Sequence, residues 1–421
     1  MTTASPNPRA SGPYWSRGSA PRGPSTRVRI AFDATIPARS LTGVGVYARE
    51  LFAALEARPV DVHWWQRPLG PPGPSRRRVA NGARLLAWYL LATRRQVGRE
   101  GIDVFHSACA VGPVDPGCAH VMTVHDATLW TMDSPYGAAD RLFHRVFSLL
   151  AARRAAAVIV PSRTARDAVA DVYGVDRARL HVVPHGVPPA FRPIPAVERE
   201  RVLAELGIGQ PYVLFVGAEP PRKNLPRLVE AFARSTEARG DRHTLLVLAG
   251  PPEPRDHRVE VTAAKHGVAN RVRRLGAMDA GHLRALYAGA RCLAYVSLCE
   301  GFGLPIVEAM ACGAPVLTSN GSSLAEVAGD AALLVDPSRV GEIANGLSML
   351  LEDRALACRL AERGLARSRA FSWRRTAEDT ENVYLSALGR PAPPAGPSLQ
   401  LEAALPRAED VPRHLPERLG V

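Results

Sequence analysis

A buried strand that runs through a glycine-rich turn into a helix constrains the fold of this chain more than any other feature. The apolar run at residues 292–296 predicts the strand, and two glycines follow it within residues 297–303. Pro305 suits the first turn of the helix, where its missing N–H would have no partner. Strand, glycine turn and helix in succession are the unit of a doubly wound parallel sheet, whose ligands lie at the C-terminal ends of the strands.

The same unit opens each half of the chain. Residues 28–33 predict a strand that leads through a glycine turn into a helix, and residues 211–217 predict another. A proline-rich linker at residues 188–195 separates the halves, and 421 residues suit two domains. The sequence therefore predicts an α/β chain of two Rossmann-like domains. Further strands are predicted at residues 60–65, 102–106, 120–126, 157–160, 180–183, 244–250, 272–276 and 316–319.

Composition places boundaries at both ends of this ordered part. Residues 1–26 are rich in arginine and proline and predict a disordered basic leader, and residues 390–421 predict a disordered tail. Between them we place an N-terminal domain at residues 27–190, a C-terminal domain at residues 191–370 and a last helix at residues 371–389.

The net charge of +13 is the unusual bulk property. It suits phosphate-bearing substrates, an anionic membrane surface or nucleic acid, although arginine-rich composition alone can also produce it. The six cysteines form no CxxC pair and no metal-type pairing with histidine, which indicates reduced thiols. The sequence has no apolar run of about 20 residues and no signal peptide. We therefore expect a cytoplasmic protein, with peripheral contact at the inner face of an anionic membrane as a further option.

One segment bears on that option. Arginines flank an aromatic, apolar helix at residues 76–95, as in helices that lie in a membrane interface. The alternative is a helix buried against the sheet, with its ends solvated by arginine. We favour the buried helix because the segment leads directly into a core strand.

Two glutamates flank the start of the helix at Pro305. Glu300 lies on the loop, and Glu308 lies about one turn into the helix. The free N–H groups at a helix N-terminus form an anion site, and carboxylates accept hydrogen bonds from hydroxyls. This arrangement suits a ligand with a sugar, a phosphate and a ribose, which is a nucleotide sugar. The alternative is a surface loop with one solvated glutamate and one glutamate favoured by the helix dipole.

The stretch from Glu300 to Glu308, with residues 309–316 after it, resembles the E-x7-E signature of retaining glycosyltransferases of family 4, also called glycosyl transferases group 1. The resemblance extends over residues 28–388. It implies the GT-B fold, in which two Rossmann-like domains face a central cleft. In that fold the C-terminal domain binds the nucleotide sugar, the N-terminal domain binds the acceptor, and the last helix crosses back to the N-terminal domain.

The resemblance also implies roles within the signature. Glu300 would bind sugar hydroxyls and orient the donor, and Glu308 would accept hydrogen bonds from the ribose. Backbone N–H groups near Phe302, Gly303 and Leu304 would bind phosphate or sugar.

Two adjacent cations lie at the C-terminal side of the strand predicted at residues 211–217. Arg222 and Lys223 can neutralise a diphosphate, the first with a planar fork and the second as a point charge. The resemblance implies that they hold the donor's diphosphate, and the alternative is a solvated basic turn. Asn224 is placed to cap the helix that follows.

Three more positions belong to the predicted cleft. Gly43 and Gly45 follow the first strand; the third glycine of a dinucleotide fingerprint is absent, so we expect no nicotinamide site. In the family this glycine loop faces the cleft, whereas the alternative is a purely structural turn. His125 ends a strand and resembles the family histidine that faces the sugar. His185 stands where the family more often has asparagine, which leaves its role open, and we treat it as structural.

These features predict an enzyme of the EC 2.4 type. We expect transfer of a hexose, mannose for preference, from a nucleotide sugar to a glycan, lipid-linked or small-molecule acceptor. The resemblance implies retention by a same-side displacement in which the leaving diphosphate helps to deprotonate the acceptor. No D-x-D motif stands where the fold would need one, so we expect no metal and no other cofactor.

Two other classes stay open. An inactive GT-B scaffold that binds sugars is one of them, and the presence of both Glu300 and Glu308 argues against it. A basic nucleic-acid-binding protein is suggested by charge alone, and the chain lacks recognisable helix-turn-helix, RNA-recognition and zinc patterns. We therefore expect no nucleic acid partner.

Overall fold

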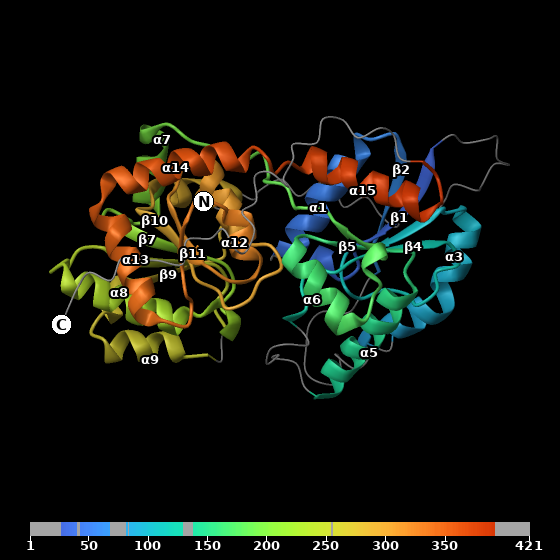
Figure 1. Cartoon of the computed structure of the whole chain (residues 1–421), viewed down its shortest axis with the longest axis horizontal. Coiled ribbons are helices and arrows are strands. Elements are labelled where there is room, and N and C mark those ends of the chain that lie inside the picture. Colours follow the sequence, from blue (N-terminus) through green and yellow to red (C-terminus); the bar gives the residue numbers. More distant parts are fainter. Residues whose placement is uncertain are drawn as a thin grey trace, which may run out of the picture.

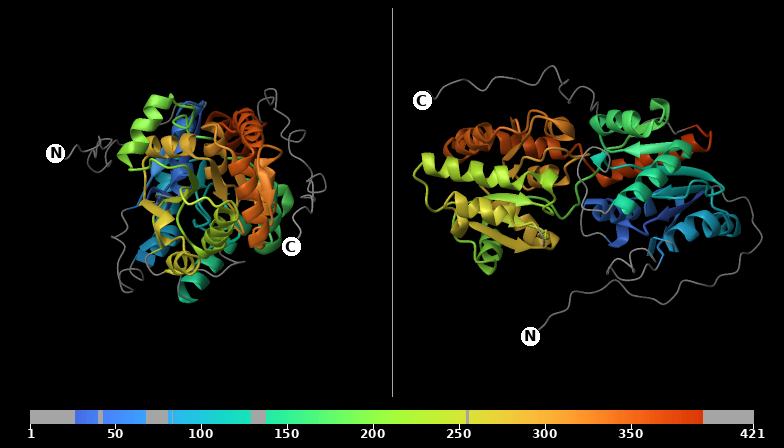
Figure 2. Two further views of the ribbon diagram at one scale, coloured as in Figure 1. Left: turned by 90° about the vertical axis from the view of Figure 1, so that its left-hand side faces the viewer. Right: turned by 90° about the horizontal axis from the view of Figure 1, so that it is seen from below.

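A computed structural model describes residues 27–39, 43–67, 81–82, 84–128, 138–253 and 256–391, with the backbone alone for residues 138–144. The chain forms two lobes (Figure 1). Each lobe is a parallel sheet with helices on both faces, as two further views show (Figure 2). Three segments that bear on the sequence predictions lie outside the described residues: the leader at residues 1–26, the arginines at residues 76–78 and the tail from residue 392 onward.

The first lobe contains a six-stranded sheet in the order β2-β1-β3-β4-β5-β6, and every neighbouring pair is parallel. Most of its strands are buried on both faces, which is why they read as apolar runs in the sequence. The order of the strands reverses between β1 and β3. The strands are β1 (Val28–Asp33), β2 (Val60–Trp65), β3 (Val104–Ser107), β4 (Ala119–Thr123), β5 (Ala157–Val160) and β6 (Leu180–Val182).

The second lobe contains another all-parallel sheet, in the order β12-β11-β10-β7-β8-β9. Its order reverses between β7 and β10, and ligands of doubly wound sheets bind at such a point. The prediction of two doubly wound α/β units is confirmed. The strands are β7 (Tyr212–Val216), β8 (Leu245–Ala249), β9 (Val272–Gly276), β10 (Cys292–Tyr295), β11 (Val316–Ser319) and β12 (Leu333–Val335).

The helices cover the sheets and connect their strands. In the first lobe they are α1 (Gly43–Glu56), α3 (Thr93–Glu100), α5 (Ala138–Arg154) and α6 (Arg163–Tyr173). From the second lobe onward they are α7 (Ala196–Glu205), α8 (Leu225–Ala238), α9 (Arg258–Lys265), α10 (Ala280–Gly289), α11 (Leu304–Ala311), α12 (Ser322–Ala328), α13 (Val340–Glu352), α14 (Arg354–Ser368) and α15 (Trp373–Ala387).

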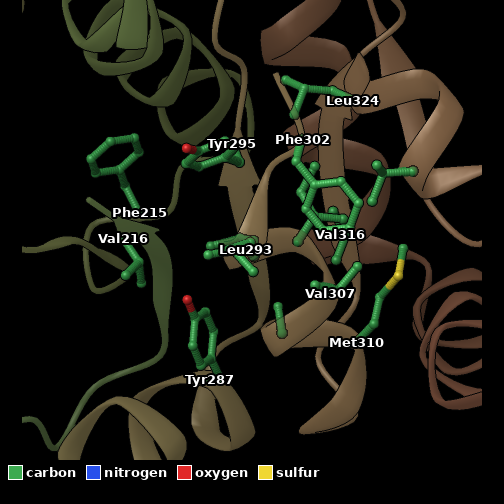
Figure 3. Packing of buried hydrophobic residues seen from close by; sticks show 14 of the residues in the cluster. Phe215, Val216, Tyr287, Leu293, Tyr295, Phe302, Val307, Met310, Val316 and Leu324 are labelled. Atoms are coloured by element: carbon green, nitrogen blue, oxygen red, sulfur yellow. The ribbon is translucent and has the colours of Figure 1, made fainter. Parts of the chain in front are cut away.

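The core of the second lobe lies between β10 and the helices beside it (Figure 3). Leu293 of β10 is fully buried, and the rings of Phe215 and Tyr295 stack at 5.8 Å between centroids. Phe302, Val307 and Met310 extend this core from the loop and helix that follow β10. The predicted binding loop after β10 is therefore anchored in the hydrophobic core of the second lobe.

Two local expectations were wrong. The helix α1 begins at Gly43, so Gly43 and Gly45 lie in its first turn and not on a loop before it. Tyr47 and Leu51 are buried one turn apart on the same helix, and this packing outweighs the low helix propensity of glycine. Asn224 makes no side-chain cap to α8. Its backbone has a left-handed conformation. The side-chain nitrogen Nδ2 of Asn224 donates to the carbonyls of Val296 and Pro337 instead.

The segment with the flanking arginines packs on the first sheet. Trp88 and Tyr89 are buried in a cluster with strand residues, within a π-helical turn, η2 (Trp88–Ala92). Leu90 and Leu91 of the same turn are 54% and 69% exposed. No helix within the described residues is long and apolar enough to cross a bilayer.

The last helix, α15, lies over the first lobe although the chain reaches it from the second (Figure 1). The hydroxyl of Tyr384 is 2.6 Å from Nδ1 of the buried His106. Arg58, just after α1, binds Glu381 and Glu378 at 2.7 and 3.1 Å. These contacts tie the end of the ordered chain to the sheet of the first lobe.

The lobes also meet at the start of α6. Ser162 caps this helix by accepting from the N–H of Ala165, and its hydroxyl donates to the carbonyl of Gly301 in the second lobe at 2.8 Å. Glu326 of α12 accepts from the N–H groups of Arg163 and Thr164 at 2.9 and 3.0 Å. A carboxylate of one lobe thus completes the N-terminal cap of a helix in the other.

Candidate active site

The loops that follow β7 and β10 meet where the strand order of the second sheet reverses. Arg222 and Lys223 lie on a short turn, η4 (Pro221–Lys223), after β7, and Glu300 lies on the loop after β10. The N–H of Leu298 donates to the carbonyl of Arg222 at 2.8 Å, which joins the two loops. The fold therefore brings three predicted site residues together from sequence positions nearly eighty residues apart.

Glu300 is buried between the two cations. One of its carboxylate oxygens lies 2.5 Å from Nη1 of Arg222, and the other lies 2.6 Å from Nζ of Lys223. The hydroxyl of Tyr295 donates to Glu300 at 3.2 Å and accepts from Lys223. Ser323 of α12 donates to the backbone carbonyl of Glu300 at 2.7 Å. These bonds hold the cations in one arrangement.

The charges of this cluster follow from burial and pairing. Burial alone would raise the pKa of Glu300, but Lys223 and Arg222 outweigh it and lower that pKa to about 2. Burial lowers the pKa of Lys223, an effect that Glu300 partly offsets. Burial would lower the pKa of Arg222 too, but Glu300 raises it above its usual value. At neutral pH the ionised Glu300 neutralises one of two cations, which leaves a net positive site that suits a diphosphate.

The loop after Glu300 passes close to the first lobe. A Cβ at Gly301 would lie 1.6 Å from the carbonyl oxygen of His125, so no larger residue fits there. Gly303, the residue before α11, has a φ of +102°, a conformation that favours glycine. The ring of Phe302 is buried against His185 and Phe371. Leu304 begins α11, and its side chain lies 3.4 Å from where a Cβ of Gly43 would be.

Glu308 lies one turn into α11, as expected, but is buried. The hydroxyl of Tyr287 on α10 donates to it at 2.8 Å. Burial raises the pKa of Glu308 to about 7, with a further contribution from Glu50 of α1. The two glutamates of the signature therefore differ in charge near neutral pH, since Glu300 is ionised and Glu308 is half protonated.

His125 follows β4, which ends at Thr123 and not at His125 as predicted, and its ring lies 4.7 Å from that of Tyr47. Its Nε2 is 3.1 Å from the carbonyl of Ala108, and its Nδ1 is 3.2 Å from Nε2 of His185. Burial lowers the pKa of His125. The loop between β10 and α11, residues 296–303, is the predicted donor loop, and it passes His125 at Gly301. Gly43 lies beside Leu304, and Gly45 is buried within α1.

Some of these residues were missed from the sequence. Tyr295 is the last residue of β10, and the rule that ligands lie at strand ends could have identified it. Tyr287 lies within α10 and Ser323 within α12, and no motif marks either. Among the described residues, no group of three His, Cys, Asp or Glu side chains is arranged to hold a metal ion.

Comparison with known proteins identifies the family of the chain. Residues 41–191 match the family described as Glycosyltransferase Family 4, and residues 198–367 match Glycosyl transferases group 1. O-antigen chain mannosyltransferase B of Escherichia coli is 32% identical over 266 residues, which are 63% of this chain and 69% of that protein. The chain belongs to the glycosyl transferases group 1 family.

Two further proteins are also similar to this chain. MMP alpha-(1->4)-mannosyltransferase of Mycolicibacterium hassiacum is 32% identical over 324 residues, 72% of this chain and 75% of that protein. The fold matches sucrose-phosphate synthase of Thermosynechococcus elongatus with a TM-score of 0.70 at 23% identity, covering 86% of this chain and 100% of that one. The group 1 chain is therefore a GT-B glycosyltransferase of the EC 2.4 class that uses a nucleotide sugar.

Proposed function

We propose that this glycosyltransferase moves a mannosyl group from a nucleotide sugar to a hydroxyl of a glycan or lipid-linked acceptor, with retention of anomeric configuration. Arg222 and Lys223, fixed on one carboxylate at the switch point of the second sheet, carry the proposal. Charge develops on the diphosphate as its bond to the sugar breaks, and preorganised cations stabilise such charge. Glu300 holds these cations and orients the donor, and Glu308 accepts hydrogen bonds from the ribose.

Retention is proposed from the resemblance of residues 300–308 to the signature of retaining enzymes, and the state of Glu300 bears on how it is achieved. A double displacement needs a carboxylate nucleophile near the anomeric carbon. Both oxygens of Glu300 are bonded to cations, which makes this carboxylate a poor nucleophile. We therefore favour a same-side displacement. The acceptor oxygen bonds to the anomeric carbon on the face that the diphosphate leaves, and the acceptor proton passes to a diphosphate oxygen.

The reaction is proposed to need no metal. In many transferases a divalent cation neutralises the diphosphate, and here Arg222 and Lys223 take that role, with one net positive charge left after the pairing with Glu300. Adventitious metal would then have no effect on the rate. The absence of a nucleic acid partner is likewise part of the proposal, because the sequence lacks recognisable helix-turn-helix, RNA-recognition and zinc patterns.

The sugar and the acceptor rest on different observations. Two of the similar proteins are named as mannosyltransferases, which supports mannose. The exposed Leu90 and Leu91, next to Arg94 and Arg95, support peripheral contact with an anionic membrane that carries a lipid-linked acceptor. We assign no base to the donor.

A donor panel tests the proposed activity. GDP-, UDP-, ADP- and dTDP-sugars, each with glucose or mannose where available, are incubated with the enzyme with and without EDTA, and free nucleotide is measured. We expect slow hydrolysis of one mannose donor, unchanged by EDTA and lost in Glu300→Ala. Loss of activity with EDTA would contradict metal-free transfer. Absence of binding to every donor would favour an inactive sugar-binding scaffold.

Donor affinity should depend on pH through Glu308. Its pKa of about 7 leaves it mostly protonated at pH 6 and mostly ionised at pH 8. Ribose hydroxyls donate to the ionised form of Glu308. The affinity for the intact nucleotide sugar that the panel identifies should therefore rise about tenfold between these two pH values. Isothermal titration in Glu308→Gln serves as the control, because the amide does not titrate. An affinity that falls with pH in the unaltered enzyme would contradict the role of Glu308.

A further inference from the structure

His185 lies where the two lobes meet, although nothing in its sequence context assigns it a role. Its ring is 4.7 Å from that of Tyr47 on α1 and 5.0 Å from that of Phe302 on the donor loop. It stacks on Trp373, the first residue of α15, at 6.0 Å with 18° between the planes. Three separate elements of the chain therefore converge on one buried imidazole.

The contacts of His125 determine which of its nitrogens carries the hydrogen. Its Nε2 faces the carbonyl oxygen of Ala108 at 3.1 Å, and a carbonyl oxygen only accepts, so Nε2 must be protonated. Burial lowers the pKa of His125, which keeps the ring neutral. A neutral imidazole carries one hydrogen, so Nδ1 of His125 is a bare acceptor.

His185 is the donor to that acceptor. Its Nε2 is 3.2 Å from Nδ1 of His125, so Nε2 of His185 carries the hydrogen. Burial lowers the pKa of His185 as well, and its Nδ1 is therefore bare. Consistent with this assignment, Nδ1 of His185 is buried and has no hydrogen-bond partner among the described residues. A single N–H between the rings thus fixes the tautomers of both.

We propose that His185 is a positioning residue for His125. Its Nε2–H locks His125 in the tautomer whose Nε2 carries the hydrogen, and its ring sets the distance between His125 and the donor loop at Phe302. The proposal rests on the proposed glycosyl transfer and on the sugar contact that the family resemblance implies for His125. In the other tautomer, a bare Nε2 would face the carbonyl of Ala108, and the ring would have to turn.

The unaltered protein provides the first test. Ring nitrogen shifts are recorded by NMR on protein labelled with ¹⁵N-histidine, and the signals of His125 and His185 are assigned from Asn variants at each position. We expect a protonated Nε2 and a bare Nδ1 in both rings at neutral pH. A protonated Nδ1 on His125 would overturn the proposal without any dependence on catalysis.

Two substitutions separate the hydrogen bond from the packing. His185→Phe keeps a planar ring against Phe302 and Trp373 but removes the donor, whereas His185→Gln retains an N–H donor. We expect kcat to fall about tenfold in His185→Phe, with the donor KM little changed, and to recover in His185→Gln. The ¹⁵N pattern of His125 should change in the first variant alone. His181→Gln, on β6 outside the site, is the matched control.

The outcomes distinguish this proposal from the role of His125 itself. Equal kcat values and equal ¹⁵N patterns in His185→Phe and His185→Gln would overturn the positioning role. If His125→Phe leaves kcat unchanged while His185→Phe still alters the ¹⁵N pattern of His125, the positioning is supported and the sugar contact of His125 fails. Thermal unfolding of each variant verifies that the fold is retained.

Discussion

Replacing Arg222 with alanine should lower kcat about 100- to 1,000-fold, which is the usual effect of removing one preorganised donor to a developing anion. The guanidinium is only partly exposed and lies 2.5 Å from Glu300, so its position is set before the donor binds. Lys223 cannot replace its fork, because it already binds the other oxygen of Glu300. Steady-state kinetics with the donor identified by the panel would measure the effect.

Two further variants give this result its meaning. Arg222→Lys keeps the charge but loses the planar fork, and should recover part of the rate. Arg234→Ala removes an exposed arginine that pairs with Glu230 on α8, and should leave kcat as it is. If the Arg222→Ala and Arg234→Ala enzymes had the same kcat, the proposed role of Arg222 in the reaction would be contradicted.

Replacing Glu300 with alanine should destabilise the second lobe as well as abolish activity. Lys223 would be left as a buried charge without its carboxylate, and breaking a buried ion pair in this way lowers the free energy of unfolding by about 3–5 kcal/mol. Calorimetry should show a lower Tm for the transition of that lobe. The double variant Lys223→Met with Glu300→Ala should regain part of the loss, because no unpaired lysine remains. A single variant as stable as the double variant would contradict this account.

The ion pair between Lys223 and Glu300 also makes the stability of the native state depend on pH in the acid range. The pKa of Glu300 is lowered from 4.5 to about 2 by folding, so its ionised form stabilises the native state above pH 4.5. That stabilisation is lost as the pH falls from about 4.5 toward 2. The double variant lacks this titration, so its Tm should fall less over that interval than the Tm of the unaltered enzyme.

Most strands, and the places of Arg222, Lys223 and Glu300 at strand ends, could be predicted from the sequence for a physical reason. The ion pairs of Glu300 with both cations were not predicted, because Glu300 was expected to bind sugar hydroxyls and the cations to bind a diphosphate. Strands buried on both faces must be apolar, and residues 28–33 and 157–160 match β1 and β5. Loops at the C-terminal ends of parallel strands converge, so Arg222, Lys223 and Glu300 were expected at one edge of the sheet before their contacts were known.

Other features depend on contacts between residues far apart in the chain. The pairing of His125 with His185 spans sixty residues, and each histidine alone gives no sign of it. The raised pKa of Glu308 comes mainly from burial, with a smaller contribution from the charge of Glu50 on α1, and no local pattern encodes either. The start of α1 was misplaced because tertiary packing overrides the propensity of Gly43 and Gly45.

The cap that Glu326 provides to α6 would be lost if the two lobes moved apart. Separation of the lobes would leave the first amides of α6 without their carboxylate, at a cost near that of one lost helix cap, about 0.5–2 kcal/mol. The hydrogen bond between Ser162 and Gly301 and the ring contact between His185 and Phe302 would be lost in the same motion, so this cap is one of several contributions to that cost. Glu326 therefore couples the stability of a helix in one lobe to the position of the other lobe.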